Sequence, residues 1–385
     1  SAASVGNDTD PYQLANSFVF NQNYGASFRV TNTSQLKNAN LKPERLNALE
    51  LGTELWFVEN KIQFDASIYQ NTSINQIIGR PISYASGFSN IVENGGEVRT
   101  RGIEAMLSAE IVNTGNFKWL SSVNFSRYRS IVTKLPEGVD QFVTGVANVF
   151  GGSGGSNTVF YIAQEGGRVG DMYGTGFVQV DGKTQYNDNG LPVQDNTLRL
   201  LGNYNTDFAL GFRNQFSYKN VSMSILFDGR FGGTIVSRYK AIGSTSGVLA
   251  ETLEGRETGI VGDGVVNAGT EDSPVYVPNT KTVSASSYYN AYYDRGNEAS
   301  STYDASYIKL RQVSIYYSLP KETSQKVGFE DIKLGFIGSN LLLFTENPHF
   351  DPELNAMQET NFTYGVEDIS YPSTRSWGFS IKTQF

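Results

Sequence analysis

The sequence contains no cysteine and a single histidine, His349. The absence of cysteine excludes disulfide scaffolds, thiolate metal sites and cysteine nucleophiles. One histidine excludes metal sites built from several histidines and catalysis by a histidine pair. These absences exclude only those kinds of site. Because the rest of the chain shows no catalytic constellation either, we expect no resident metal site, no cofactor and no enzyme activity.

Charged residues make up only 18% of the chain, and the net charge is −8. This acidic balance argues against nucleic acid as a partner. No stretch approaches the roughly 18 apolar residues of a transmembrane helix. The mean hydropathy of −0.31 would suggest a soluble protein, but strands of outer-membrane barrels are only half apolar and register weakly on such a scale. The chain opens on Ser1 with no charged and apolar leader, so we expect no signal peptide and a processed or incomplete chain.

Apolar residues recur instead at every second position. In residues 207–219 one face carries phenylalanine, leucine and tyrosine while the other is polar, and residues 221–231 repeat this pattern. Only Lys219-Asn220 and their neighbours separate the two runs. A period of two predicts half-buried β-strands, and the short connection predicts a hairpin.

The same alternation predicts about nine strands in all. The other runs are 49–57, 62–68, 103–111, 117–132, 307–319, 332–344 and 376–385. Within 307–319 the phase slips, because Leu310 fits one face and Val313 the other, and a bulge near Arg311 would reconcile them.

The connections alternate in length between short turns and long, polar loops. Short turns at one end and long loops at the other are the layout of an outer-membrane barrel, whereas a soluble sandwich distributes loop length over both ends. The predicted fold is therefore all-β, an antiparallel transmembrane β-barrel segment. The short connections lie near 59–60, 113–116 and 219–220, with a modest one at 320–330, and the long loops lie near 79–97, 134–206, 236–304 and 345–372.

The strand count predicts how the chain is placed. Bacterial outer-membrane barrels have an even number of strands and end on the periplasmic side. Counting nine strands back from Phe385 makes residues 1–45 an extracellular loop region and residues 46–385 the C-terminal part of a barrel. Because an open sheet edge is not tolerated in lipid, we expect a fragment that needs further strands.

Several segments carry a family resemblance. The segments are N-L-K-P-E at Asn40–Glu44, G-G-E-V-R-T-R-G-I-E at Gly95–Glu104, D-A-S-Y-I-K-L-R at Asp304–Arg311 with Leu319-Pro320 after it, G-S-N-L at Gly338–Leu341 and D-P-E at Asp351–Glu353. In this order and spacing they resemble the C-terminal part of SusC/RagA-type TonB-dependent transporters of Bacteroidetes outer membranes. Thr100 stands where that family commonly has asparagine.

The resemblance implies that this chain supplies the last nine or ten strands of a barrel of about 22, a class with a plugged lumen. It also implies a plug and a TonB-contacting segment, both N-terminal and absent from this chain. The implied partners are the rest of that barrel and plug, the TonB complex, outer-membrane lipid and a SusD-like surface lipoprotein. The implied function is uptake of glycans or oligosaccharides, with peptides as the alternative substrate.

Aromatic residues in the long loops are candidates for contact with substrate or partner, because rings with polar tips suit wet recognition surfaces. Packing of the loops against one another is the alternative that the sequence leaves open. The candidates are Tyr84, Phe88, Tyr288, Tyr289, Tyr292, Tyr293 and Arg295.

Charged residues on the polar faces of the strands are expected to line the lumen, although any water-filled interior needs polar groups. These candidates are Glu50, Glu54, Asp65, Glu104, Arg213, Asp228 and Arg230. The terminal Phe385, on the face of Trp377 and Phe379, resembles a barrel-assembly signal.

Short motifs in the loops favour ordinary structural roles. Asp181-Gly182 and Asn189-Gly190 are typical of hairpin turns, and the ligand spacing of an EF-hand is missing. Gly151–Gly155 is expected to be a flexible loop tip without the lysine of a phosphate loop. His349 is expected in a surface loop. Whether any loop binds calcium stays open.

Two other classes of function stay open beside active import. A passive porin or surface adhesin barrel would be a complete, even-stranded chain without a lipoprotein partner. A soluble β-rich binding protein or glycan hydrolase is the second alternative, although no pair of carboxylates is singled out as such a hydrolase requires.

Overall fold

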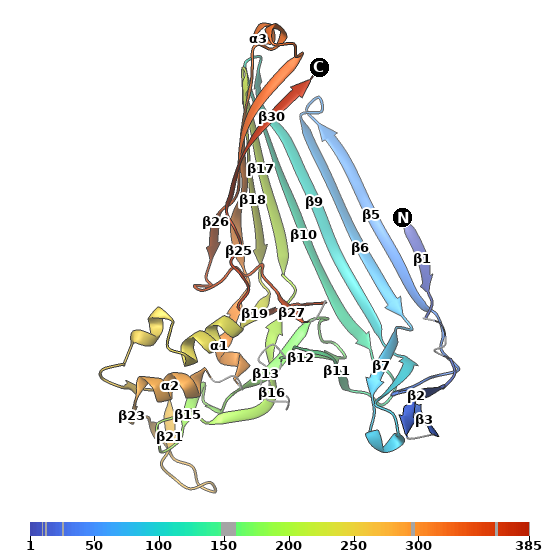
Figure 1. Ribbon diagram of the computed structural model, residues 1–385, viewed down its shortest axis with the longest axis vertical. Coiled ribbons are helices and arrows are strands. Elements are labelled where there is room, and N and C mark those ends of the chain that lie inside the picture. Colours follow the sequence, from blue (N-terminus) through green and yellow to red (C-terminus); the bar gives the residue numbers. More distant parts are fainter. Residues whose placement is uncertain are drawn as a thin grey trace. The chain divides into compact units, whose positions relative to one another are not determined.

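The computed structural model describes residues 1–9, 11, 14–24, 27–147, 159–293, 297–358 and 361–384. Its largest sheet has ten strands, which neighbour one another in the order of the chain (Figure 1). They are β1 (Ala2–Asn7), β5 (Glu44–Phe57), β6 (Ile62–Ile74), β9 (Glu97–Thr114), β10 (Phe117–Lys134), β17 (Phe208–Tyr218), β18 (Val221–Phe231), β25 (Tyr307–Ser318), β26 (Asp331–Thr345) and β30 (Ser376–Gln384).

The connections between these strands contain shorter elements. Before β9 these are β2 (Phe18–Tyr24), β3 (Ser27–Asn32), β4 (Gln35–Leu36), β7 (Ile77–Pro81), η1 (Tyr84–Ser86) and β8 (Asn90–Asn94). Between β10 and β17 they are β11 (Gln141–Ala147), β12 (Val159–Gln164), β13 (Asp171–Phe177), β14 (Gln179–Val180), β15 (Lys183–Tyr186) and β16 (Gln194–Asn203).

The connection from β18 to β25 holds most of the helices. It contains β19 (Thr234–Ser237), α1 (Arg238–Thr245), η2 (Ala250–Leu253), β20 (Ile260–Val261), β21 (Val265–Asn267), β22 (Tyr276–Pro278), β23 (Thr282–Val283), α2 (Ala285–Tyr292), η3 (Glu298–Ser301) and β24 (Thr302–Asp304). The later connections contain α3 (Lys321–Lys326), β27 (Ala356–Gln358), β28 (Asn361–Thr363) and β29 (Val366–Glu367).

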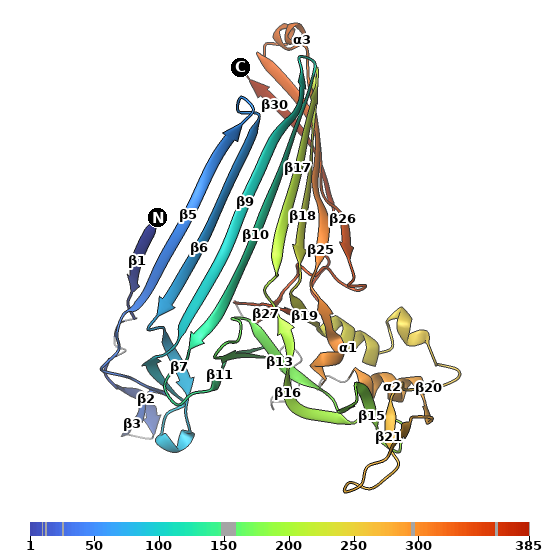
Figure 2. The same ribbon diagram turned by 180° about the vertical axis from the view of Figure 1, so that it is seen from behind.

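The chain forms two compact units, and the boundary between them crosses the β9–β10 hairpin. The first comprises residues 1–107, 126–144 and 162–169, and the second comprises residues 108–125, 145–161 and 170–385. In the second unit, the β17–β18 turn and α3 lie at one end of the long strands, while α1, α2 and β13 lie at the other (Figures 1 and 2). This alternation of short turns and long loops is the one that the sequence predicted.

The tight turns form where the backbone can enter the left-handed region. Val58, Glu59 and Asn60 all have positive φ angles between β5 and β6, and Lys219 has φ +50° between β17 and β18. Asparagine tolerates this region better than most residues. The predicted hairpins near 59–60, 113–116 and 219–220 are confirmed. The modest connection at 320–330 contains α3, which follows Pro320.

The structure corrects the boundary of the predicted loop region 1–45. Residues 2–7 form β1, which pairs antiparallel with β5 from Ala2 opposite Leu49 to Asn7 opposite Glu44. The segment has no alternating apolar pattern, and all six of its residues are exposed. The strand therefore forms through backbone pairing with β5. The side-chain pattern of residues 2–7 does not predict a strand.

The loops of the second unit share a hydrophobic core. This loop core consists of Ala147, Val159, Met172, Val236, Ala241, Ala356 and Val366, with Tyr161, Leu201 and Tyr204 packed against it. Val236 and Ser237 of β19 pair with Val366 and Glu367 of β29, and β24 covers the other edge of β19. Segments from three separate long loops thus fold together.

Candidate functional site

The register of the large sheet separates apolar from polar side chains. Residues directly opposite each other in antiparallel strands point to the same face. Phe212 lies opposite Phe227, Met223 opposite Ile315, and Phe336 opposite both Ile315 and Phe379. We call this the apolar face. Many side chains on this face are exposed: Leu51 is 71% exposed and Phe379 is 88% exposed.

Aromatic residues mark both ends of the apolar face in the second unit. Tyr218 and Tyr317 flank Val221 in the register at the turn end. Phe208 and Phe231 stack at the loop end with ring centroids 4.7 Å apart. An apolar band between two aromatic girdles is typical of the lipid-facing surface of outer-membrane barrels.

The predicted lumen-lining residues all lie on the opposite, polar face. Glu50 is opposite Tyr69, Glu54 opposite Asp65, Asp228 opposite Lys309 and Arg230 opposite Tyr307. Arg213 follows Phe212, so it lies on the polar face too, although its cross-strand neighbour is Leu226. Glu104 alternates with the exposed Ile103, and successive side chains of a strand point to opposite faces. Their role in a lumen stays a prediction.

A polar cavity of about 420 Å³ lies in the second unit, towards the turn end of β17, β18 and β25. Lys118, Arg213, Gln215, Ser224 and Gln312 contribute to its lining. Lys118 is paired with Glu110 at 2.9 Å. Hydroxyl, amide and cationic groups therefore face this space, which suits hydrated solutes or a polar protein segment.

The predicted bulge near Arg311 is confirmed. Leu310 pairs with Phe227 and Gln312 with Leu226, so Arg311 is the extra residue. The extra residue keeps Leu310 and Val313 on the apolar face and leaves Arg311 on the polar face, where it pairs with Asp228. The slip in the sequence pattern thus has a direct structural counterpart.

The bulge forms part of an ion-pair cluster at the loop end of the polar face. Lys309 Nζ lies 2.5 Å from Asp351 Oδ2 and 2.5 Å from Glu353 Oε2. Arg311 contacts both carboxylate oxygens of Glu353, at 2.9 and 3.0 Å. The side chains of Lys309 and Asp351 are 2% and 4% exposed.

The cluster fixes charge states as well as positions. Burial raises the pKa of Glu353, but hydrogen bonds from Arg311 and Lys309 outweigh it and lower that pKa to about 2. Glu353 is therefore ionised at neutral pH. Since Asp351 and Glu353 belong to the last long loop, the cluster ties that loop to the start of β25. The D-A-S-Y-I-K-L-R and D-P-E motifs were visible in the sequence, but their pairing was not.

The aromatic candidates on α2 mainly pack against one another. Tyr288 stacks on Tyr292 with centroids 5.4 Å apart, and Tyr289 stacks on Tyr293 at 6.3 Å. Tyr292 also lies 5.1 Å from the ring of Phe177. Burial raises the pKa of each of these four tyrosines. Internal packing thus occupies much of this cluster, and its contact with substrate or partner stays a prediction.

The remaining candidates fall in different settings. Tyr84 is 82% exposed on η1, and Phe88, in the same loop, is half-buried. Ser83 caps η1 by accepting a hydrogen bond from the Ala85 amide. Arg295, Phe385 and the glycine run 151–155 lie outside the described residues.

The Asp-Gly and Asn-Gly motifs form turns, as predicted. Asp181 and Gly182 both have positive φ angles and connect β14 to β15 as a two-residue hairpin. Asn187 Oδ1 accepts hydrogen bonds from the amides of Asn189 and Leu191, which closes the next turn. In the part of the chain that the structure describes, no group of three or more histidine, aspartate or glutamate residues could hold a metal ion.

His349 is more enclosed than the surface position that we expected. Its ring stacks on Tyr239 at 5.9 Å, and its Nε2 lies 3.7 Å from Glu251 Oε2. Burial lowers the pKa of His349. The residue therefore packs the last loop against α1 and η2. Among the described residues, no helix is long and apolar enough to cross a membrane.

Comparison with known proteins agrees with this geometry. A family model described as "TonB dependent receptor-like, beta-barrel" matches residues 3–225. The chain belongs to this family. The SusC/RagA-type resemblance noted in the sequence is thereby confirmed at the level of family and fold.

Relatives with curated names are found in Formosa agariphila. The TonB-dependent receptor P3 is 26% identical over 380 residues, which cover 90% of this chain and 35% of the relative. The TonB-dependent receptor P39 is 24% identical over 412 residues, covering 91% of this chain and 36% of the relative. The chain thus spans about a third of the length of these relatives.

Solved structures share the fold. A chain of the RagAB peptide transporter matches with a TM-score of 0.71 and 19% identity, covering all of this chain and 40% of the other. The open-open state of the RagAB peptide importer matches with a TM-score of 0.72, 18% identity and coverage of 100% and 39%.

Proposed function

We propose that this chain forms part of the barrel wall of a TonB-dependent, SusC-like outer-membrane importer, which takes up glycans or oligosaccharides with a SusD-like lipoprotein. The ten-stranded sheet with an apolar and a polar face carries the proposal. Membership of the TonB-dependent receptor-like family supports it.

Each part of the structure has a role in this mechanism. The apolar face holds the wall in outer-membrane lipid, because burying apolar surface there is favourable. The polar face, with Arg213, Asp228 and Arg230, lines the solute path. The folded loops shape the extracellular mouth and meet the lipoprotein. The chain's contribution is transport without covalent chemistry.

The sheet must be completed by other strands in such a barrel. β1 and β30 are the two edges of the sheet, and an unpaired edge is costly in lipid. We propose that the remainder of the same transporter supplies the missing strands, the plug and the contact with the TonB complex.

Peptides are the alternative substrate class. The RagAB proteins, which share this fold, are named as a peptide transporter. A passive porin or an adhesin barrel is the alternative of another class, and it would need neither an energy source nor a lipoprotein.

The experiment is uptake by cells that carry the full polypeptide, with a deletion strain as control. We expect the protein in the carbonate-resistant outer-membrane fraction, with co-purification of a surface lipoprotein. We also expect fluorescent oligosaccharide uptake that stops when a protonophore collapses the proton gradient. Uptake that survives the protonophore would favour the porin, and uptake of peptides alone would favour the peptide importer. Release by carbonate would contradict the barrel.

A further inference from the structure

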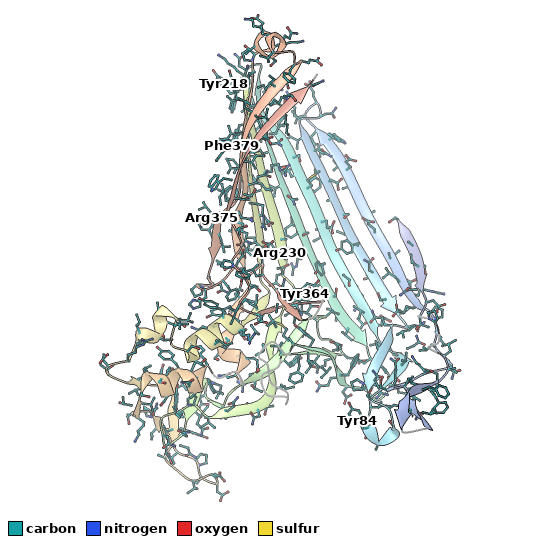
Figure 3. All side chains as sticks on the ribbon, in the orientation of Figure 1. Tyr84, Tyr218, Arg230, Tyr364, Arg375 and Phe379 are labelled. Carbon is teal, nitrogen blue, oxygen red and sulfur yellow. The ribbon has the colours of Figure 1, made fainter. Side chains whose placement is uncertain are left out.

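Tyr364 presents an aromatic ring on the folded loops of the second unit (Figure 3). It lies in the turn between β28 and β29, and 54% of the residue is exposed. One side of the ring stacks on Tyr204, with centroids 5.6 Å apart and planes inclined by 25°. Tyr204 in turn meets Tyr161 edge to face at 5.9 Å. The exposed ring is therefore supported by Tyr204, which Tyr161 contacts in turn.

The backbone that carries this ring is fixed on both sides. The Tyr161 hydroxyl donates a hydrogen bond to the Tyr364 carbonyl at 2.7 Å, and the Val236 amide donates one to the Gly365 carbonyl at 2.9 Å. Gly365 has φ +72°, and a Cβ there would lie 2.5 Å from Met172 Sδ. Only glycine fits this close approach.

Three long loops thus position one ring. Tyr161, Met172 and Tyr204 come from the loop after β10, Val236 from the loop after β18, and Tyr364 from the loop after β26. A ring that is already ordered loses little conformational freedom on binding, which favours affinity.

Two charged residues that follow Tyr364 in the described part of the loop, Glu367 and Asp368, contact internal partners. Glu367 is 1% exposed and accepts hydrogen bonds from the Ser237 hydroxyl at 2.8 Å and the Tyr239 amide at 3.0 Å. Asp368 pairs with Arg238. The ring therefore offers a flat apolar face with a polar tip, a surface that suits an uncharged ring with apolar C–H groups and peripheral hydroxyls.

The α2 tyrosines differ from Tyr364 in the number of aromatic rings that each one contacts. Each of Tyr288, Tyr289, Tyr292 and Tyr293 contacts at least two other rings. Within the part of the chain described, Tyr364 contacts one ring only. Of these five tyrosines, Tyr364 is the most exposed.

We propose that Tyr364, backed by Tyr204 and Tyr161, is a stacking platform for a sugar ring of a neutral oligosaccharide. This inference rests on the proposed function and assigns a binding subsite to it. The chemistry of the platform favours neutral saccharides over charged peptides.

The test uses the full transporter polypeptide, purified with its lipoprotein, on an array of neutral oligosaccharides, acidic oligosaccharides and peptides. The variants are Tyr364→Ala, Tyr364→Phe and, as a matched control, Tyr371→Ala, whose ring is 95% exposed. We expect Tyr364→Ala to weaken binding of a neutral oligosaccharide by about tenfold, the order of a lost aromatic contact. Tyr364→Phe and Tyr371→Ala should bind like the wild type. Retained heat-modifiable migration on gels checks that each variant is folded.

Other results overturn the platform in distinguishable ways. Unchanged saccharide binding by Tyr364→Ala removes the platform and leaves the importer in place. Loss of the lipoprotein from Tyr364→Ala with saccharide binding retained makes the ring a partner contact. Wild-type binding to peptides alone refutes the saccharide ligand. Wild-type binding to neither class contradicts the proposed import function itself.

Discussion

At the scale of single residues, Arg311 links the strand pattern to the loops. As the extra residue of a bulge, it shares the polar face with Lys309 and Gln312 and reaches both Asp228 and Glu353. Lys309 holds the same loop through Asp351, with both side chains almost fully buried. Buried pairs of this kind are expensive to break, because the remaining charge loses its partner without regaining water.

Replacing Lys309 by methionine should therefore release the last long loop. We expect a loss of about 3 kcal/mol in the stability of the docked loop, since the side chains of Asp351 and Glu353 would lose the buried ammonium group that contacts both of them. The measurement is cleavage of surface loop 346–372 by added protease. Lys333→Met is the control, because Lys333 is 48% exposed and 3.4 Å from Asp331, and it should change little. Equal rates of cleavage in the wild type and in Lys309→Met would show that the ion-pair cluster does not hold the loop against β25.

The same cluster predicts a dependence on pH. The folded-state pKa of Glu353 is lowered from 4.5 to about 2, so its stabilising contribution is present above 4.5 and is lost as the pH falls towards 2. We expect the loop to resist an acid-active protease at pH 5 and to yield progressively below about pH 4. Glu353→Gln should make the protease resistance of the loop less dependent on pH. If resistance in the variant falls as steeply with pH as in the wild type, a group other than Glu353 causes the dependence.

At the scale of elements, strands and turns were predictable because their signals are local. Alternation over ten residues identifies a strand face, and the slip between Leu310 and Val313 predicts the bulge that the structure contains. The folding of the loops depends on distant partners. Lys309 and Asp351 are 42 positions apart, and Tyr161 and Tyr364 are 203 apart. No local pattern encodes such pairs, so the contacts that position Tyr364 could not be predicted from strand alternation or from motifs.

The loop core predicts that the three long loops of the second unit open together. Val236 is fully buried among Met172, Val366 and their neighbours, and Val236→Ala should cost about 1–3 kcal/mol through the cavity it leaves. Hydrogen–deuterium exchange should rise in β13 and β29 as well as in β19. Exchange that rises in β19 alone would show that the loops are independent. Val248→Ala, at a residue 74% exposed, is the control.

At the scale of the whole molecule, the proposed function depends on the two faces of the sheet. The register places Met223, Ile225 and Phe227 on one face of β18 and Ser222, Ser224 and Asp228 on the other. Family membership and the shared fold agree with one lipid-facing and one lumen-facing surface. Transport through a barrel requires both surfaces, so the division of side chains between the two faces is the property to test. The proposed role of the polar face in the solute path follows from that division.

The most direct test is a scan of single spin-labelled cysteines along β18, which the absence of cysteine from this chain makes straightforward. The full polypeptide is reconstituted in lipid, with any cysteine elsewhere replaced, and collisions with oxygen and with a water-soluble nickel complex are measured. Labels at 223, 225 and 227 should collide mainly with oxygen, and labels at 222, 224 and 228 mainly with the nickel complex. Accessibility should therefore alternate with a period of two along the strand. Equal exposure of both sets to nickel would place both faces in water and contradict the membrane-barrel account.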